Sequence, residues 1–122
     1  MLNVLRMDSF PVAPDKYRHN HPVFDPVAFG RRLKAVCLAH FGTEMIACVE
    51  LGCRSQLQIR RYWSGQQLPA CKLLYTLTAF GFNLNWLFKG EGPMYDMSAP
   101  AGLALAQSGV AVTLPDDDKE MA

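Results

Sequence analysis

The sequence predicts an all-α protein, a compact bundle of five short helices over residues 26–92 of a 122-residue chain. Two patterns indicate this fold class. Apolar residues recur at intervals of three and four, the period of a helix with one buried face. Residues that favour helix starts precede these stretches, and glycines follow them, as is typical of helix ends. Because half of the residues are hydrophobic, we expect one domain with a real core.

The first helix is expected between Asp25 and Gly42. Asp25 is a favourable N-cap, and Pro26 suits the first helical position because a proline lacks the N–H that is unpaired there. Gly42 ends the helix. The expected inner face consists of Phe29, Leu33, Val36, Cys37 and His40.

The second and third helices are expected between Thr43 and Gly52 and between Ser55 and Gly65. Thr43 caps the second helix, which is about two turns long. Ser55 and Gln58 have the S-x-x-Q spacing of a capping box at the start of the third. The expected inner faces are Ala47, Cys48 and Leu51 in the second helix, and Ile59, Tyr62 and Trp63 in the third.

The fourth and fifth helices are expected after Pro69 and after Asn83. Gly81 follows the fourth helix, Asn83 caps the fifth, and the sequence KGEGP stops it. The expected inner faces are Leu73, Leu74, Leu77 and Phe80 in the fourth helix, and Leu84, Trp86, Leu87 and Phe88 in the fifth.

The two ends of the chain differ from this bundle. Residues 1–24 are interpreted as an N-terminal arm, in which the HNH of residues 19–21 is a surface feature rather than a metal site. Residues 97–122 are interpreted as a C-terminal tail with an acidic, frayed end. In the tail, AGLALAQ could form a turn or two of helix and GVAVTL a strand. The tail could mediate self-association, link to a further domain, or fold onto its own bundle.

Several function classes lack support. No apolar run approaches the ~20 residues of a membrane helix, and the N-terminus does not resemble a secretion signal, so we expect a cytoplasmic protein. The four cysteines form no C-x-x-C pair, and Cys37 and Cys48 fall on apolar faces as reduced thiols. We expect no metal, no cofactor and no catalytic residues, since no catalytic pattern has local support.

Charge is distributed unevenly although the net charge is only +1. Residues 31–72 carry seven basic side chains against two carboxylates, whereas residues 91–122 carry six carboxylates against one lysine. The stretch RSQLQIRRYWSG, residues 54–65, has no carboxylate at all. A basic, carboxylate-free helix favours an anionic partner.

Two short helices joined by a tight turn in a small bundle have the plan of a helix-turn-helix, whose second helix lies in the major groove of DNA. Glutamine can pair with adenine and arginine with guanine. We therefore expect residues 25–96 to form a domain that binds double-stranded DNA. The candidate base-reading residues are Gln56, Leu57, Gln58, Arg60 and Arg61. The candidate phosphate contacts are Thr43, Arg54, Ser55 and Gln66.

Several stretches resemble the lambda-repressor-like helix-turn-helix family. AFGRRLKAV is similar to the opening of that domain, TEMIACVELG to its first motif helix, and IRRYWSGQQLP to the stretch after it. NLNWLFKGEGPMY resembles the close of the N-terminal domain in temperate-phage CI-type repressors. The resemblance covers about residues 26–95 and implies a five-helix domain that binds operators as a dimer. Such repressors often carry a further, self-cleaving domain, for which this chain has no room.

The spacing from Gly52 to Gly65 is one residue longer than is commonest in that family. If the extra residue lies in the turn, Ile59 is the buried anchor and Gln56 is the first base reader. If it lies later, Leu57 or Gln58 turns inward and the readers shift by one.

The favoured hypothesis is a transcriptional regulator, a phage or prophage repressor that binds a palindromic operator as a homodimer. One alternative is an antitoxin that binds a toxin through the arm or the tail and also binds its own promoter. The other is a protein-binding adaptor that has kept the fold without DNA binding.

Overall fold

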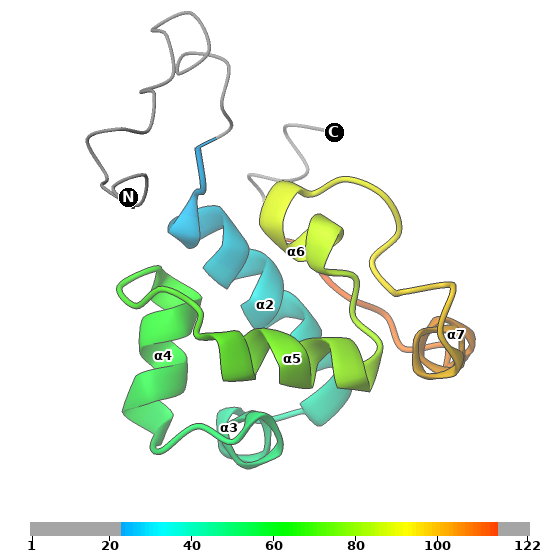
Figure 1. The fold of residues 1–122 in the computed structure, drawn as a ribbon. Helices are drawn as coiled ribbons and strands as arrows, with labels where there is room; N and C mark the ends of the chain where they lie inside the picture. The colour runs from blue at the N-terminus through cyan, green and yellow to red at the C-terminus, as the bar shows by residue number, and fades with distance from the viewer. Residues whose placement is uncertain (1–22, 115–122) are drawn as a thin grey trace, which may run out of the picture.

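The computed structural model describes residues 23–114, and this part of the chain is all-helical (Figure 1). It contains six helices and no strand; an isolated bridge joins Phe82 and Tyr95. The helices are α2 (Pro26–Phe41), α3 (Glu44–Leu51), α4 (Gln56–Ser64), α5 (Cys71–Phe80), α6 (Leu84–Lys89) and α7 (Pro100–Gln107). The five helices expected over residues 26–92 are confirmed as α2 to α6, and α7 adds a sixth.

Four of the five expected helix starts are confirmed by side-chain capping bonds. The Asp25 carboxylate accepts hydrogen bonds from the backbone N–H groups of Val27 and Ala28, at 3.1 Å each. The side chains of Thr43, Ser55 and Asn83 cap α3, α4 and α6 in the same manner. Each bond satisfies one of the N–H groups that a helix leaves unpaired at its start.

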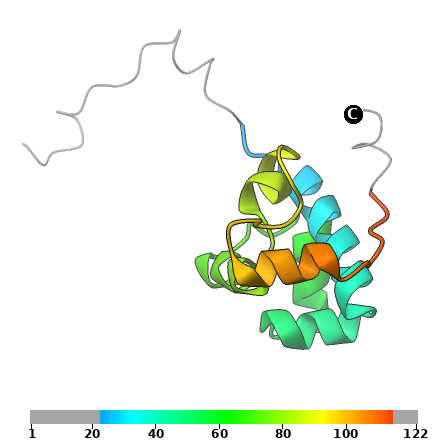
Figure 2. The same ribbon diagram turned by 90° about the vertical axis from the view of Figure 1, so that its right-hand side faces the viewer.

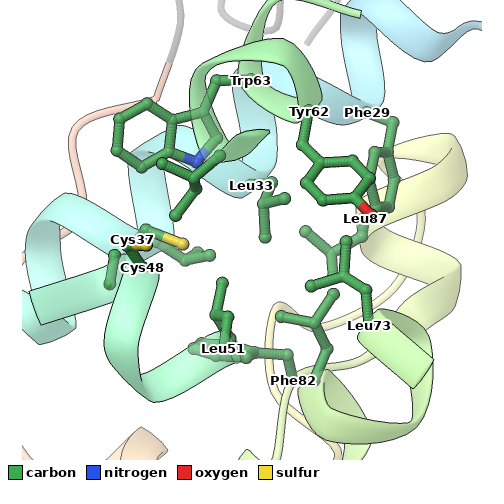
Figure 3. Close-up of a cluster of buried hydrophobic side chains, with 14 of the residues drawn as sticks. Phe29, Leu33, Cys37, Cys48, Leu51, Tyr62, Trp63, Leu73, Phe82 and Leu87 are labelled. Atoms are coloured by element: carbon green, nitrogen blue, oxygen red, sulfur yellow. The ribbon is translucent and has the colours of Figure 1, made fainter. Parts of the chain in front are cut away.

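The predicted inner faces meet in one core (Figure 3). The buried side chains from the predicted faces are Phe29, Leu33, Val36, Cys37, Ala47, Cys48, Leu51, Ile59, Tyr62, Trp63, Leu73, Leu77, Trp86 and Leu87. Four other predicted members, Leu74, Phe80, Leu84 and Phe88, are only partly buried at its edge. His40 is also only half-buried, and its Nε2 lies 2.7 Å from the hydroxyl of Tyr95.

Helix α2 runs through the middle of the bundle and packs against α3, α4 and α6 (Figure 1). Gly30 allows the close approach of α2 to α4. A Cβ atom at this position would lie 2.7 Å from the carbonyl carbon of Trp63 and closer still to the carbonyl oxygens of Tyr62 and Trp63. The position of α4 therefore depends on the absence of a side chain at Gly30.

The C-terminal segment folds onto the bundle. The helical interpretation of AGLALAQ is confirmed by α7, which lies across the bundle (Figure 2). The strand prediction for GVAVTL is wrong: residues 109–114 have no regular secondary structure. A strand needs a neighbouring edge for its backbone hydrogen bonds, and the described helices offer none. Leu105, Val112 and Leu114 pack instead against the core.

Most of the expected arm, including His19 and His21, lies outside the described residues, as does the acidic end at 115–122. At the end of this arm, Phe24 makes edge-to-face ring contacts with Phe29 and Phe88. Within residues 23–114, no helix has both the length and the apolarity that a membrane crossing requires.

Candidate nucleic-acid interface

Residues 52–55 connect α3 to α4 by a tight turn. Gly52 adopts the left-handed conformation with φ 71°, and the N–H of Cys53 donates to the carbonyl oxygen of Cys48 at 2.9 Å. Ser55 then caps α4 by accepting from the N–H of Gln58 at 3.2 Å. The Gln58 side chain is also hydrogen-bonded to the turn, because its Oε1 accepts from the backbone N–H of Arg54 at 2.7 Å. The first bond of the expected capping box is thus present, whereas the Gln58 side chain accepts from the N–H of Arg54 instead of that of Ser55.

The register of α4 follows the first of the two alternatives. Ile59 is completely buried, whereas Leu57 is 53% exposed. Ile59 is therefore the buried anchor, and α4 begins at Gln56. The core decides this register, because only the set of Ile59, Tyr62 and Trp63 faces α2 as one apolar surface.

The face of α4 opposite that buried set is formed by Leu57, Arg61 and Ser64, all exposed. At 100° per residue these three positions lie on one side of the helix. Gln56 and Gln58 lie on its two flanks and are half-buried. The structure therefore puts Leu57 and Arg61 at the centre of the outward surface, and Gln58 is held by its bond to the turn.

Arg60 forms an ion pair with a carboxylate of the preceding helix. Its Nε donates to Oε1 of Glu44 at 2.7 Å. The hydrogen bond raises the pKa of Arg60 and lowers that of Glu44. Residues 54–65 contain no carboxylate, but the surface around α4 does, because Glu44 lies in the first turn of α3 next to Arg60.

Two hollows flank α4. One, of about 270 Å³, lies between the turn and the start of α5 and is lined by Arg54, Gln58 and Lys72, among others. The other, of about 500 Å³, is lined by Lys34, Glu44, Arg60 and Trp63 with two further residues. In the second hollow the Lys34 ammonium lies 5.9 Å from the ring centroid of Trp63. Basic side chains therefore stand on both sides of the outward surface of α4.

The candidate phosphate contacts do not all lie together. Arg54 is exposed at the turn beside the first hollow. Thr43 and Ser55 are exposed, and the hydroxyl of each accepts a capping bond. Gln66 lies two residues after the end of α4, at the opposite end of that helix from Arg54. These four residues thus surround α4 rather than form one cluster.

Sequence reasoning missed Lys72. This residue lies in the first turn of α5, a helix whose N-cap Ala70 makes no side-chain capping bond. An uncapped helix start presents N–H groups that attract an anion. The proximity of Lys72 to Arg54 depends on the packing of α5 against α3, which no local pattern reveals.

The thiols beneath this surface are free and poorly suited to chemistry. Burial raises the pKa of Cys37 to about 12, even with the indole of Trp63 beside it. Burial also raises the pKa of Cys53 to about 11. The prediction that Cys37 and Cys48 are buried, reduced thiols is confirmed.

Comparison with known proteins gives no match to a family model, a curated protein or a solved structure.

Proposed function

We propose that the α3–α4 pair is a helix-turn-helix and that this protein is a sequence-specific double-stranded DNA-binding regulator. The observation that carries the proposal is the outward surface of α4, where polar and basic side chains stand opposite a completely buried Ile59. A recognition helix needs this combination, because one face must anchor it while the other enters the major groove.

Three side chains of α4 suit particular contacts in the groove. Arg61 can donate two hydrogen bonds to guanine, and Gln56 can pair with adenine. The apolar side chain of Leu57 suits the methyl group of thymine. Gln58 contributes mainly by holding the turn through its 2.7 Å bond to the N–H of Arg54.

Arg60 is proposed to act from a fixed position. Its bond to Glu44 orders a long side chain that would otherwise lose rotamer freedom on binding. The same carboxylate lies near any phosphate that approaches Arg60, and it repels that phosphate. Replacement of Glu44 by glutamine should therefore strengthen DNA binding of all sequences.

The sides of α4 are proposed to contact the two DNA backbones. Arg54 and Lys72 line one hollow together, and the N–H groups at the start of α5 add to their attraction for a phosphate. Such contacts position the protein without reading the sequence. Loss of either cation should weaken binding of all sequences alike.

The narrower proposal is a phage or prophage repressor that acts in the cytoplasm and binds a palindromic operator as a dimer. It is supported by the resemblance of NLNWLFKGEGPMY and neighbouring stretches to CI-type repressors. A dimer reads two half-sites with one surface, so that operator symmetry mirrors protein symmetry.

The test is selection of binding sequences from a random duplex library, followed by fluorescence anisotropy with the selected and a scrambled duplex. We expect a preference of about 10³-fold or more and a strong salt dependence. Gln56→Ala and Arg61→Ala should each cost about 1–3 kcal/mol and relax one base position. Arg54→Ala should weaken both duplexes equally.

Lys89→Ala is the matched control for these variants. Lys89 is an exposed cation on α6, which packs against α2 and α5 rather than α3 or α4. Its loss should leave binding of the selected duplex almost unchanged. If no sequence is enriched, or if K89A weakens binding as much as R61A, the proposal is wrong.

One observation favours the alternative of a protein-binding adaptor. The outer side of α3 exposes Met45, Ile46 and Val49, with exposed fractions of 59%, 49% and 72%. An apolar surface of this kind favours a protein partner over a polyanion. An adaptor would tolerate Gln56→Ala and Arg61→Ala in its biological activity but would lose that activity with Val49→Lys.

A further inference from the structure

The hollow between α2 and α4 presents more positive than negative charge. We call it the α2–α4 hollow, and its lining residues are Lys34, Leu38, Glu44, Arg60, Trp63 and Ser64. Its one carboxylate is engaged, because Oε1 of Glu44 accepts from Nε of Arg60 at 2.7 Å. The pKa of Glu44 is lowered mainly by this bond and further by the charge of Lys34. Arg61, which follows Arg60, is exposed and forms no ion pair with a carboxylate of residues 23–114.

Apolar side chains line the same hollow. Trp63 is only 8% exposed, and the ammonium of Lys34 lies 5.9 Å from the centroid of its ring. Leu38 contributes a second apolar side chain. Water screens a charge beside an apolar surface less than it screens a charge on an open surface. The α2–α4 hollow therefore attracts carboxylates more strongly than the same cations would if they were spread over the surface.

Of the two parts of the chain outside the described residues, only one is acidic. Residues 115–122, PDDDKEMA, contain four carboxylates and one lysine. Residues 1–22 contain two carboxylates and three lysine or arginine residues. Charge complementarity therefore favours residues 115–122, which we call the acidic segment, as the part of this chain that fits the α2–α4 hollow.

The described chain ends on the side of the bundle where this hollow lies. Leu114 packs against the core, so the acidic segment starts from a fixed point. In Figure 2, the orange-red trace of residues 109–114 lies on the side of α2 away from α5. The α2–α4 hollow is lined from α2 and contains no residue of α5, whereas the hollow beside Arg54 includes Lys72 and Leu73 of α5.

The acidic segment is long enough to reach the hollow. Eight residues span at most about 26–29 Å when extended. A domain of the size of residues 23–114 has a radius of gyration of about 12 Å. The segment can therefore cover this side of the bundle without any rearrangement of the helices.

We propose that the acidic segment of this chain occupies the α2–α4 hollow and competes with DNA for Arg60 and Arg61. The regulatory part rests on the proposed function, whereas the contact itself does not require DNA. A short tether gives a local concentration in the millimolar range, so that even a weak contact is populated. The apparent Kd for DNA then rises in inverse proportion to the fraction of molecules whose surface is free. Selected and scrambled duplexes should be affected by the same factor.

The first test compares amide NMR spectra of the full chain and a neutralised variant, without DNA and at low salt. The variant carries Asp116→Asn, Asp117→Asn, Asp118→Asn and Glu120→Gln, which keep the length of the segment. We expect the amide signals of Lys34, Arg60 and Ser64 to shift and that of Lys89 on α6 to stay. The shifts should shrink in about 0.5 M salt, which screens the attraction. Shifts confined to residues 112–122, or shifts at Arg54 and Lys72 instead, would overturn the proposal.

The second test measures DNA affinity by fluorescence anisotropy. The neutralised variant should bind both the selected and the scrambled duplex about threefold to tenfold more tightly than the wild type at low salt. The matched control separates competition from net charge. Asp117→Asn with Asp118→Asn raises the net charge by the same amount as Glu91→Lys, at an exposed position after α6. The first should strengthen binding and the second should leave it almost unchanged. Equal gains in affinity would contradict a local competition.

The two tests distinguish this proposal from the proposed function. If the amide shifts occur and neither form binds any duplex, the contact of the acidic segment stands and the proposed function fails. If both forms bind the selected duplex with the same affinity and no shifts occur, the proposed function stands and this proposal is wrong.

Discussion

Gly30→Ala tests the close packing of α2 on α4, because helix propensity and packing predict opposite results. Alanine in place of glycine within a helix normally stabilises a protein by about 0.5–1 kcal/mol. At Gly30 the added Cβ atom would lie 2.7 Å from the carbonyl carbon of Trp63. Carbon atoms prefer a separation of about 3.5–4.0 Å, so α2 and α4 must move apart by about 1 Å.

The cost of that movement sets the expected magnitude. Insertion of a methyl group into a well-packed interface costs about 1–3 kcal/mol when the neighbouring backbone has to shift. Here the opposing atoms belong to the backbone of Tyr62 and Trp63, which cannot rotate away. After the gain in helix propensity is subtracted, we expect a net loss of about 1–2 kcal/mol. The melting temperature should fall by about 4–8 °C for each kcal/mol.

The assay is urea unfolding followed by the fluorescence of Trp63 and Trp86, with Gly42→Ala as the control. Gly42 has φ 86° and open space around its Cα, so alanine there introduces backbone strain without contact. Both variants should lose stability, but only G30A should shift the emission of the folded state. A G30A protein as stable as the wild type, or more so, would refute the close approach of the two helices.

Three further predictions concern burial. Ile59→Ala should lower the free energy of unfolding in urea by about 2–5 kcal/mol, because Ile59 is completely buried. Leu57 is 53% exposed, so Leu57→Ala should change the free energy of unfolding by less than about 0.5 kcal/mol. Equal effects of the two variants would contradict the register of α4. Burial lowers the pKa of His40 below 6.5, so the unfolded chain binds the proton more tightly than the folded chain does. The free energy of unfolding should therefore be retained above pH 6.5 and fall as the pH falls through the folded-state pKa. His40→Gln should remove this part of the pH dependence, which unfolding at several pH values measures. Cys71 is exposed and should react first with a thiol reagent. Cys37 is buried and has a pKa of about 12, so it should react only when the protein unfolds. Fast reaction of Cys37 in the Cys71→Ser variant would contradict its burial.

Local features of this protein were predictable from its sequence. Four helices have a side-chain cap that accepts from an N–H group two or three residues ahead, namely Asp25, Thr43, Ser55 and Asn83. Such caps can be recognised from the sequence because the interacting groups are only a few residues apart. The inner faces of α2, α3 and α4 were also predictable, because helical periodicity alone decides which side chains share a side.

The candidate site was predictable only in part. The polar character of α4 could be recognised, but its register depended on whether Ile59 or a neighbour filled the core. Gln58 was expected to face DNA, whereas the structure binds it to the N–H of Arg54.

Only the tertiary structure decided the interactions between distant parts of the chain. Glu44 meets Arg60 because α3 packs against α4, and Lys72 lies beside Arg54 because α5 packs against α3. The sequence of residues 97–114 by itself indicated an apolar segment with a short helix at AGLALAQ and a strand at GVAVTL. The helix formed as α7, but the bundle offered an apolar surface and no strand edge, so residues 109–114 formed no strand and packed Val112 and Leu114 against the core.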